Sequence, residues 1–184
     1  MADQTGDPVV PQSISAFVGA WFEEHRAEIH GWRRHIHRHP ETANREVETT
    51  RYIAARLAEY GVSAHRFPET GLMADIGPET EGGRVAFRAD IDALPVTEVT
   101  GLEFTSEVRG VAHACGHDVH TTVVLGLACA IADYDRAFGL PVGVRVIFQP
   151  AEEVWVGGAT DVIEWGALKG CLLYTSLSGL ARQT

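Results

Sequence analysis

Helical periodicity dominates the first sixty residues of the chain. Over residues 13–38, apolar side chains recur three or four positions apart, which predicts one amphipathic helix. Pro40 should end this helix, since the residue before a proline is pushed out of the helical region. A second helix is expected over residues 45–61, with Asn44 as its N-terminal cap and Gly61 closing it.

The spacing then changes to that of β-strands. Runs at 72–77 and 83–92 are rich in apolar residues and are bounded by turn-forming residues, which is typical of strands. A third run, 142–150, alternates apolar and other residues and should end at Pro150. A long loop is expected over residues 93–114.

Two further helices are expected between and after these strands. Asp118 should cap an apolar helix over 119–134, and another helix is expected to begin within 157–168. The buried stripe of the first of these helices is predicted to be Val119, Val123, Leu127 and Ile131. Strands that alternate with helices favour an α/β fold: a layered, mixed and partly parallel sheet with flanking helices.

The end of the chain differs from this pattern. After a helix that ends near Leu168, an α/β fold would return to a buried strand, but residues 170–184 offer four apolar residues and then a polar tail. We therefore expect a disordered tail over 1–12, the N-terminal part of a catalytic domain over 13–169, and a non-native tail over 170–184.

Composition narrows the classes of protein to consider. A hydrophobic content of 45% and a charged content of 22% are those of a soluble globular protein. The formal net charge of −10 argues against nucleic acid or an anionic membrane surface as a partner, because both carry negative charge. Small substrates remain compatible with it, since their binding depends on local charge.

No targeting or membrane segment is recognisable. The longest apolar run, 123–132, is far shorter than the ~20 residues that a membrane span needs. The first residues have neither a basic start nor an apolar stretch. Three cysteines, odd in number and widely spaced, do not form a disulfide framework, so we expect a cytoplasmic protein.

Chemistry-bearing residues follow two of the predicted strands and precede one helix. The run 83–92 contains Asp90 and Asp92, Glu152 and Glu153 follow the strand that Pro150 ends, and the segment 113–120 reads HACGHDVH. Open α/β sheets bind ligands outside the carboxyl ends of their strands. The three clusters are therefore expected to converge on one rim of the sheet.

Cys115 and His117 are the first metal-ligand candidates. A thiolate and an imidazole suit zinc, and Gly116 between them allows a tight backbone turn. One of the adjacent glutamates could bind the metal ion while the other accepts a proton from water. Asp90 could orient a ligand, and Asp92 could do the same or shape the loop.

The remaining histidines are interpreted as structural. His113 and His120 are interpreted as polar residues near a helix start. Histidines 35, 37 and 39 lie at the end of an amphipathic helix, where they favour the helix dipole and the last carbonyl groups.

Taken together, the motifs resemble a known family. The segments WRRHIHRHPE, GRVAFRADIDALPV, HACGHDVHTTVVLG and VIFQPAEE, in this order, resemble the aminoacylase and hippurate-hydrolase branch of the two-metal amidohydrolases and metallopeptidases. That family includes carboxypeptidase G and succinyl-diaminopimelate desuccinylase. The resemblance runs from about residue 30 to 168, which is most of the chain.

The resemblance implies a zinc-peptidase-like catalytic domain, two zinc or manganese ions and hydrolysis of N-acyl amino acids by metal-bound hydroxide. By position, it implies that Cys115 is the bridging metal ligand, His117 and Glu153 are terminal ligands, Glu152 is the general base, and Asp90 is the carboxylate behind the ligands. The substrate class would include N-acetyl and N-benzoyl amino acids.

The chain also departs from the family. Members are longer, carry an inserted lid or dimerisation domain, and supply two further histidine ligands after the paired glutamates, whereas this sequence has no histidine after His120. We therefore expect an amino-terminal fragment with weak or partial metal occupancy and doubtful activity. A homodimer is expected in the full-length protein only.

Two alternatives stay open on the sequence. Cys115 could act as a nucleophile with His117 or His113 as its base. The chain could also be a non-catalytic remnant of the fold that binds metal or a protein partner.

Overall fold

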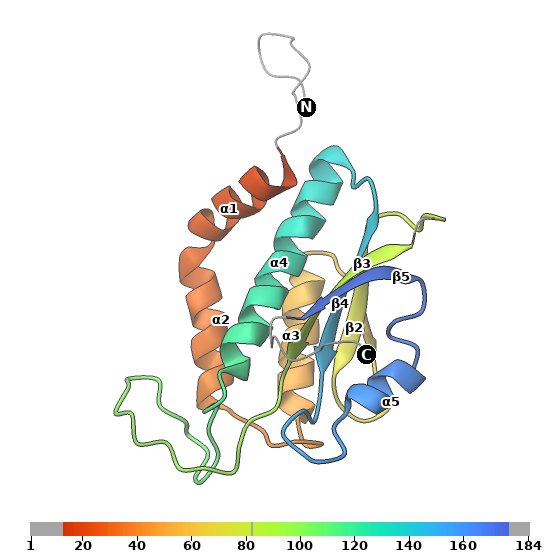
Figure 1. Cartoon of the computed structure of the whole chain (residues 1–184). Coiled ribbons are helices and arrows are strands. Elements are labelled where there is room, and N and C mark those ends of the chain that lie inside the picture. The colour runs from red at the N-terminus through yellow and green to blue at the C-terminus, as the bar shows by residue number, and fades with distance from the viewer. Residues whose placement is uncertain (1–12, 82, 177–184) are drawn as a thin grey trace.

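The computed structural model describes residues 13–81 and 83–176, with side chains described up to residue 171. Helices α1 (Ile14–Glu24), α2 (Arg26–Arg38), α3 (Val47–Glu59) and α4 (His117–Phe138) lie on one face of a twisted sheet, and the short α5 (Ala159–Glu164) lies on the other (Figure 1). This confirms the predicted layered α/β class.

The sheet is mixed. Its strands are β1 (Ala64–Arg66), β2 (Leu72–Ile76), β3 (Arg84–Asp90), β4 (Gly143–Gln149) and β5 (Cys171–Ser176), in the order β1-β2-β4-β3-β5. Strand β3 pairs in parallel with β4 on one side and β5 on the other. Strand β2 pairs antiparallel with β1 and with β4. The β3–α4–β4 crossover is the unit that brings two strand ends to the same edge of the sheet.

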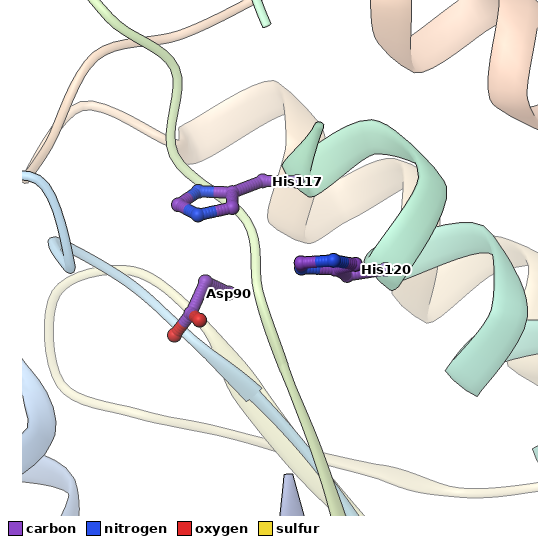
Figure 2. A group of neighbouring side chains, drawn as sticks. All are labelled: Asp90, His117 and His120. Carbon is purple, nitrogen blue, oxygen red and sulfur yellow. The ribbon is translucent and has the colours of Figure 1, made fainter. Parts of the chain in front are cut away.

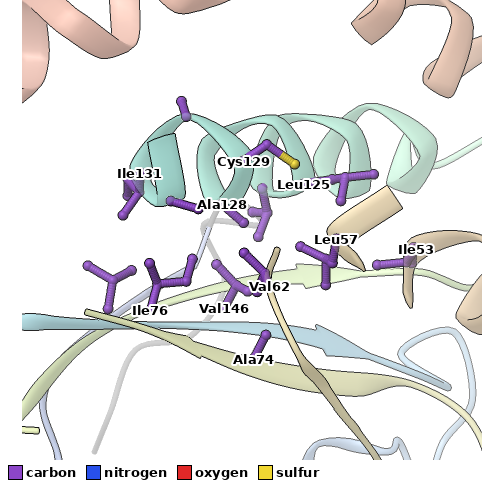
Figure 3. Close-up of a cluster of buried hydrophobic side chains, with 14 of the residues drawn as sticks. Ile53, Leu57, Val62, Ala74, Ile76, Leu125, Ala128, Cys129, Ile131 and Val146 are labelled. Carbon is purple, nitrogen blue, oxygen red and sulfur yellow. The ribbon is translucent and has the colours of Figure 1, made fainter. Parts of the chain in front are cut away.

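The main core lies between α4 and the sheet. Figure 3 shows Leu125 and Ala128 on the side of α4 that faces the sheet, above Ile76 and Val146, and Cys129 belongs to the same core. A smaller apolar cluster lies on the opposite face of the sheet, where Val162 of α5 packs near Ile147. Strand β4 is central and buried along its whole length, so both of its faces contact core.

The first predicted helix is broken. His25 has φ −95° and ψ 14°, outside helical geometry, and it separates α1 from α2. Its Nδ1 lies 2.9 Å from the carbonyl oxygen of Trp21, and its ring stacks on the Trp21 indole at 3.9 Å between centroids. This local side-chain bonding competes with the regular helix, and the apolar spacing did not reveal it. The helix does end just before Pro40, as predicted.

Neither predicted N-terminal cap is correct. Asn44 adopts a left-handed conformation with φ 63°, and the Glu41 carboxylate instead accepts hydrogen bonds from the N–H groups of Glu48 and Thr49 at 3.2 and 2.8 Å. Gly61, with φ 74°, closes α3 as expected. Asp118 lies inside the first turn of α4, after Gly116 at the cap position.

The predicted buried stripe of α4 is also wrong in its first half. Val119 and Val123 are 42% and 38% exposed, whereas Leu125 is fully buried. The helix packs against the sheet on one side and against α1 and α2 on another, so its buried face is broad and is lined by small residues. The spacing of apolar residues alone could not distinguish the buried face of α4 from its exposed face.

The structure also contains two short strands that were not expected from the sequence. Strand β1 has only three residues and no alternation that would predict it. Strand β5 lies within the segment 170–184 that was expected to be a non-native tail, and it pairs with β3 where an α/β fold would place its next strand. The expected N-terminal tail and residues 177–184 lie outside the described residues, and in the described part no helix is long and apolar enough to cross a membrane.

The corrected face of α4 gives a stability prediction. Leu125→Ala should lower the free energy of unfolding by about 2–5 kcal/mol, because it leaves a cavity in the main core. Val123→Ala on the exposed side should cost less than about 1 kcal/mol. Urea unfolding followed by circular dichroism measures both, and equal losses would contradict this assignment of the buried face.

Candidate metal centre

The end of β3 and the start of α4 meet at one edge of the sheet. Gly116 has φ 83°, a left-handed conformation that suits glycine and lets the chain turn directly into α4 at His117. The hydroxyl of Thr121, one turn further along α4, donates to the main-chain oxygen of Asp90 at 3.0 Å. This bond ties the helix to the strand end.

Cys115, His117 and Glu153 converge as the sequence predicted. One ligand atom from each of these side chains lies within 4.8 Å of the other two. Glu152 is also close, with its Oε2 3.8 Å from His117 Nε2, and Glu153 Oε1 lies 3.9 Å from the same nitrogen. The predicted geometric convergence is therefore present, while the roles of the individual residues stay predictions.

The imidazole of His117 is fixed in an orientation that suits metal binding. Its Nδ1 donates to the main-chain oxygen of Asp92 at 2.9 Å. When the ring is neutral, this leaves the lone pair of Nε2 directed at the two glutamates. The side chain of His117 is 3% exposed, so water cannot easily replace these contacts.

Asp92, one of the two aspartates considered, makes the contacts that orient the site. Its Oδ1 lies 3.3 Å from His117 Nδ1, and its Oδ2 accepts a hydrogen bond from the Glu153 N–H at 2.8 Å. One carboxylate thus links the end of β3 to both α4 and the segment after β4. Sequence reasoning left its role open between orienting a ligand and shaping the loop; its contacts do both.

Asp90 occupies a different position. Its Oδ1 accepts from Arg88 Nη1 at 2.6 Å, and the same nitrogen lies 2.6 Å from Gln149 Oε1. Sequence reasoning did not single out Arg88. The signal was present, because residues 88 and 90 alternate along β3 and so point to the same face.

His120 was interpreted as an ordinary polar residue, but it lies beside the site. Figure 2 shows His117 and His120 extending from α4 toward Asp90 at the end of β3, and ligand atoms of these three residues lie within 4.8 Å of one another. His113 is buried, and neither of its ring nitrogens has a hydrogen-bond partner among the described residues. Burial lowers the pKa of His113 to about 4.

Histidines 35, 37 and 39 belong to no group of metal ligands among the described residues. His39 Nδ1 lies 2.8 Å from the main-chain oxygen of His35, as expected at a helix end. His37 does something the sequence did not predict, since its ring lies between Asp118, at 2.8 Å, and Glu98, at 3.1 Å. These contacts connect α2 to the first turn of α4 and to the long loop after β3.

The concentration of acidic groups shifts the pKa values of the ligand candidates. Burial alone would lower the pKa of His117, but its hydrogen bond to Asp92 and the charges of Asp92 and Asp90 raise it to about 9. Partial desolvation, together with the charges of the paired glutamates, raises the pKa of the Cys115 thiol to about 11. Burial raises the pKa of Asp90 to about 6 against the opposing charge of Arg88.

These side chains fit a divalent cation. Thiolate, imidazole and carboxylate are the donors that zinc accepts. The buried oxygens Asp90 Oδ2 and Glu153 Oε1 have no hydrogen-bond partner among the described residues, which is costly for carboxylates. A cation would offset that cost, so the donor set and the unpaired oxygens point to the same kind of ligand.

Comparison with known proteins agrees with this chemistry. A family model described as Peptidase family M20/M25/M40 matches residues 86–177, half of the chain. An N-acetyl-L-cysteine deacetylase from Bacillus subtilis is 46% identical over 144 residues, covering 78% of this chain and 34% of the relative. A Rhodococcus jostii protein named as a glutamate–cysteine ligase is 50% identical over 140 residues, but those cover 17% of its length and 76% of this chain.

A solved structure of a similar protein has a similar fold. The B. subtilis protein YXEP, titled a dinuclear metal binding peptidase from the M20 family, matches with a TM-score of 0.73 and 40% identity, covering 88% of this chain and 43% of that one. This chain therefore spans between about a sixth and less than half of the length of these similar proteins. The chain belongs to the peptidase family M20/M25/M40.

Proposed function

We propose that these residues form part of a metal-dependent amidohydrolase that cleaves the amide bond of N-acyl amino acids. The observation that carries the proposal is the meeting of Cys115, His117 and the glutamate pair at one edge of the sheet. The relatives support it, since one is named an N-acetyl-L-cysteine deacetylase and another an N-acyl-L-amino acid amidohydrolase.

Cys115, His117 and Glu153 would hold divalent ions, with Cys115 as the ligand shared by two of them. Zinc is the ion that this donor set favours, and manganese is the alternative. A divalent ion there would polarise the amide carbonyl and make water a nucleophile at neutral pH. In the whole protein, two histidines from beyond this segment would complete the set, as the family resemblance implies.

Glu152 is the proposed general base. Its carboxylate lies beside His117 Nε2 but is 33% exposed, so it can reach both the metal centre and an incoming substrate. It would accept a proton from the attacking water and deliver it to the leaving amine nitrogen. Glu153, held through its N–H by Asp92, is less exposed at 18% and suits the role of ligand.

Asp92 and Asp90 would support the site in different ways. Asp92 keeps the proton of His117 on Nδ1, so that Nε2 is the nitrogen available to a metal ion. Asp90, which the family resemblance implies as the supporting carboxylate, is bound to Arg88 and faces the same space as His117 and His120. Its charge adds to the attraction for a cation.

The alternative with Cys115 as nucleophile is less well supported. Nucleophilic cysteines have lowered pKa values, usually beside a cationic group or a helix N-terminus. Here partial burial, together with the neighbouring glutamates, raises the pKa of Cys115 to about 11. A thiol in that environment is a poor nucleophile but becomes a thiolate when a metal ion displaces its proton.

Metal affinity should depend on pH. At pH 6 to 8 the metal-free chain carries a proton on the Cys115 thiol and on both nitrogens of His117, because both pKa values are raised. A zinc ion must displace both protons, so its affinity for the chain should increase as pH rises, with about two protons released per ion. Competition with a chromophoric chelator at several pH values measures this.

His117→Asn should remove most of the binding and lower the release to about one proton per ion, because the Cys115 thiol must still lose its proton. His65→Asn is the matched control, because His65 lies exposed on strand β1. Zinc affinity that does not change between pH 6 and 8, or that His65→Asn reduces as much as His117→Asn does, would contradict the assignment.

Turnover can be tested after joining this chain to the remaining residues of the B. subtilis deacetylase, which aligns with 78% of it. The folded chimaera should hydrolyse N-acetyl amino acids, lose activity to a chelator and regain it with zinc or manganese. Glu152→Gln should keep the metal and lower kcat by at least ~10²-fold, since it removes the general base.

Two results of the same assay would favour the other functions. Hydrolysis that survives complete metal removal but is abolished by thiol alkylation would indicate a cysteine nucleophile. A folded, metal-loaded chimaera that is inert toward a panel of N-acyl amino acids would indicate a non-catalytic module.

A further inference from the structure

The residue before the glutamate pair has an unusual backbone conformation. Ala151 lies between Pro150 and Glu152 with φ 55°, in the left-handed region that residues with a Cβ rarely adopt. Glycine would adopt this conformation freely, yet the chain has alanine here. Contacts from elsewhere in the fold must therefore impose it.

Both polar groups of the Ala151 backbone are held. Its N–H donates to Glu46 Oε1 at 2.8 Å, and its carbonyl accepts from the Gly158 N–H at 2.9 Å. The second bond closes the loop 151–158 that carries the two glutamates. The first comes from a carboxylate 105 positions earlier in the chain.

The Glu46 side chain that accepts this hydrogen bond is fully buried. It is 0% exposed, which is exceptional for a glutamate, and burial raises the pKa of its carboxyl group. Its Oε2 accepts from the Thr70 hydroxyl at 2.8 Å. Both carboxylate oxygens therefore accept a hydrogen bond, one from Thr70 in the turn before β2 and one from the Ala151 N–H.

The surroundings leave the turn little freedom. A Cβ on Gly71 would lie 2.6 Å from the Phe148 carbonyl oxygen, and a Cβ on Gly158 would lie 2.3 Å from the Pro150 carbonyl oxygen. Backbone therefore packs directly against both sides of the segment 148–150. The Thr50 hydroxyl, one turn beyond Glu46, also accepts from the Gly71 N–H at 2.8 Å.

We propose that Glu46 is a positioning residue: its buried carboxylate holds Ala151 in the left-handed conformation and so directs Glu152 and Glu153 toward His117. If φ of Ala151 returned to a negative value, the chain after it would rotate and the two carboxylates would leave the site. The proposal deepens the proposed function and rests on it for the meaning of the two glutamates, but the conformational claim can be tested without metal.

Glu46→Leu and Glu46→Gln separate positioning from simple packing. Glutamine keeps an oxygen acceptor for the Ala151 N–H, and its amide can donate to the Thr70 hydroxyl, whereas leucine fills the space without an acceptor. In the isotopically labelled, metal-free chain, NMR should show for Ala151 the strong intraresidue HN–Hα NOE of positive φ and a slowly exchanging amide. Both should persist in Glu46→Gln and disappear in Glu46→Leu.

Glu41→Leu is the matched control. The Glu41 carboxylate accepts hydrogen bonds from the N–H groups of Glu48 and Thr49 in α3, whereas the Ala151 N–H donates to Glu46. This variant should lower the thermal midpoint while leaving the Ala151 signals unchanged. An Ala151 NOE and amide protection that survive Glu46→Leu would overturn the proposal.

Ala151→Gly gives a second test that also covers poor folding of Glu46→Leu. Glycine adopts positive φ without the hydrogen bond from Glu46. The substitution should therefore raise the thermal midpoint more in the Glu46→Leu background than in the wild-type chain. Equal increases of the thermal midpoint in the two backgrounds would contradict the positioning role of Glu46. A Glu46→Leu variant that does not fold and is not restored by Ala151→Gly would also contradict it.

Zinc affinity connects the conformation to the site. Glu46→Leu should weaken binding by about tenfold or more, as removal of supporting groups does in metal sites, and Glu46→Gln should not. Unchanged affinity in a variant that has lost the Ala151 signals would overturn the positioning role. A wild-type chain that shows the Ala151 NMR signals but binds no zinc would contradict the metal centre and still support the positioning role of Glu46. Failure of the proposed function is therefore distinguishable from failure of this inference.

Discussion

The parallel pairing of β3 with β4 is the constraint on which the site depends. It brings the carboxyl ends of two strands that are far apart in sequence to the same edge, with Asp90 paired to Gln149. Helix α4, which makes the crossover between them, necessarily begins near that edge. The site residues therefore meet because of topology and because the core fixes α4 against the sheet, with Leu125 and Val146 fully buried.

Buried polar contacts then refine what the topology places only roughly. Asp92 joins His117 to the Glu153 backbone, and Glu46 joins the start of α3 to the turn before the glutamates. His37 connects α2 to Asp118, the residue next to His117. Each of these contacts crosses between elements distant in sequence, which is how a rigid arrangement of ligands is held in place.

Much of this could be predicted from the sequence, for physical reasons that differ between features. Helix and strand periodicity identified the layers, and the position of acidic residues after strands predicted which side chains converge. Gly116 and Gly61 were correctly read as turn residues because left-handed φ values favour glycine. The motif resemblance pointed to a family that the comparisons bear out.

The features that were missed depend on tertiary contacts. The break at His25, the true cap of α3 by Glu41 and the buried face of α4 are decided by side chains from other parts of the fold. The same holds for Glu46, which reads as one charged residue among several at a helix start. Its burial and its contact with Ala151 have no signature in local sequence.

The central claim is that Cys115, His117 and Glu153 are ligands of the same metal centre, with Cys115 contributing its sulfur, and X-ray absorption of the zinc-loaded chain tests it most directly. The account predicts one sulfur neighbour at about 2.3 Å with nitrogen and oxygen neighbours at shorter distance, and loss of the sulfur in Cys115→Ser. A zinc shell of nitrogen and oxygen only, unchanged by that substitution, would contradict it.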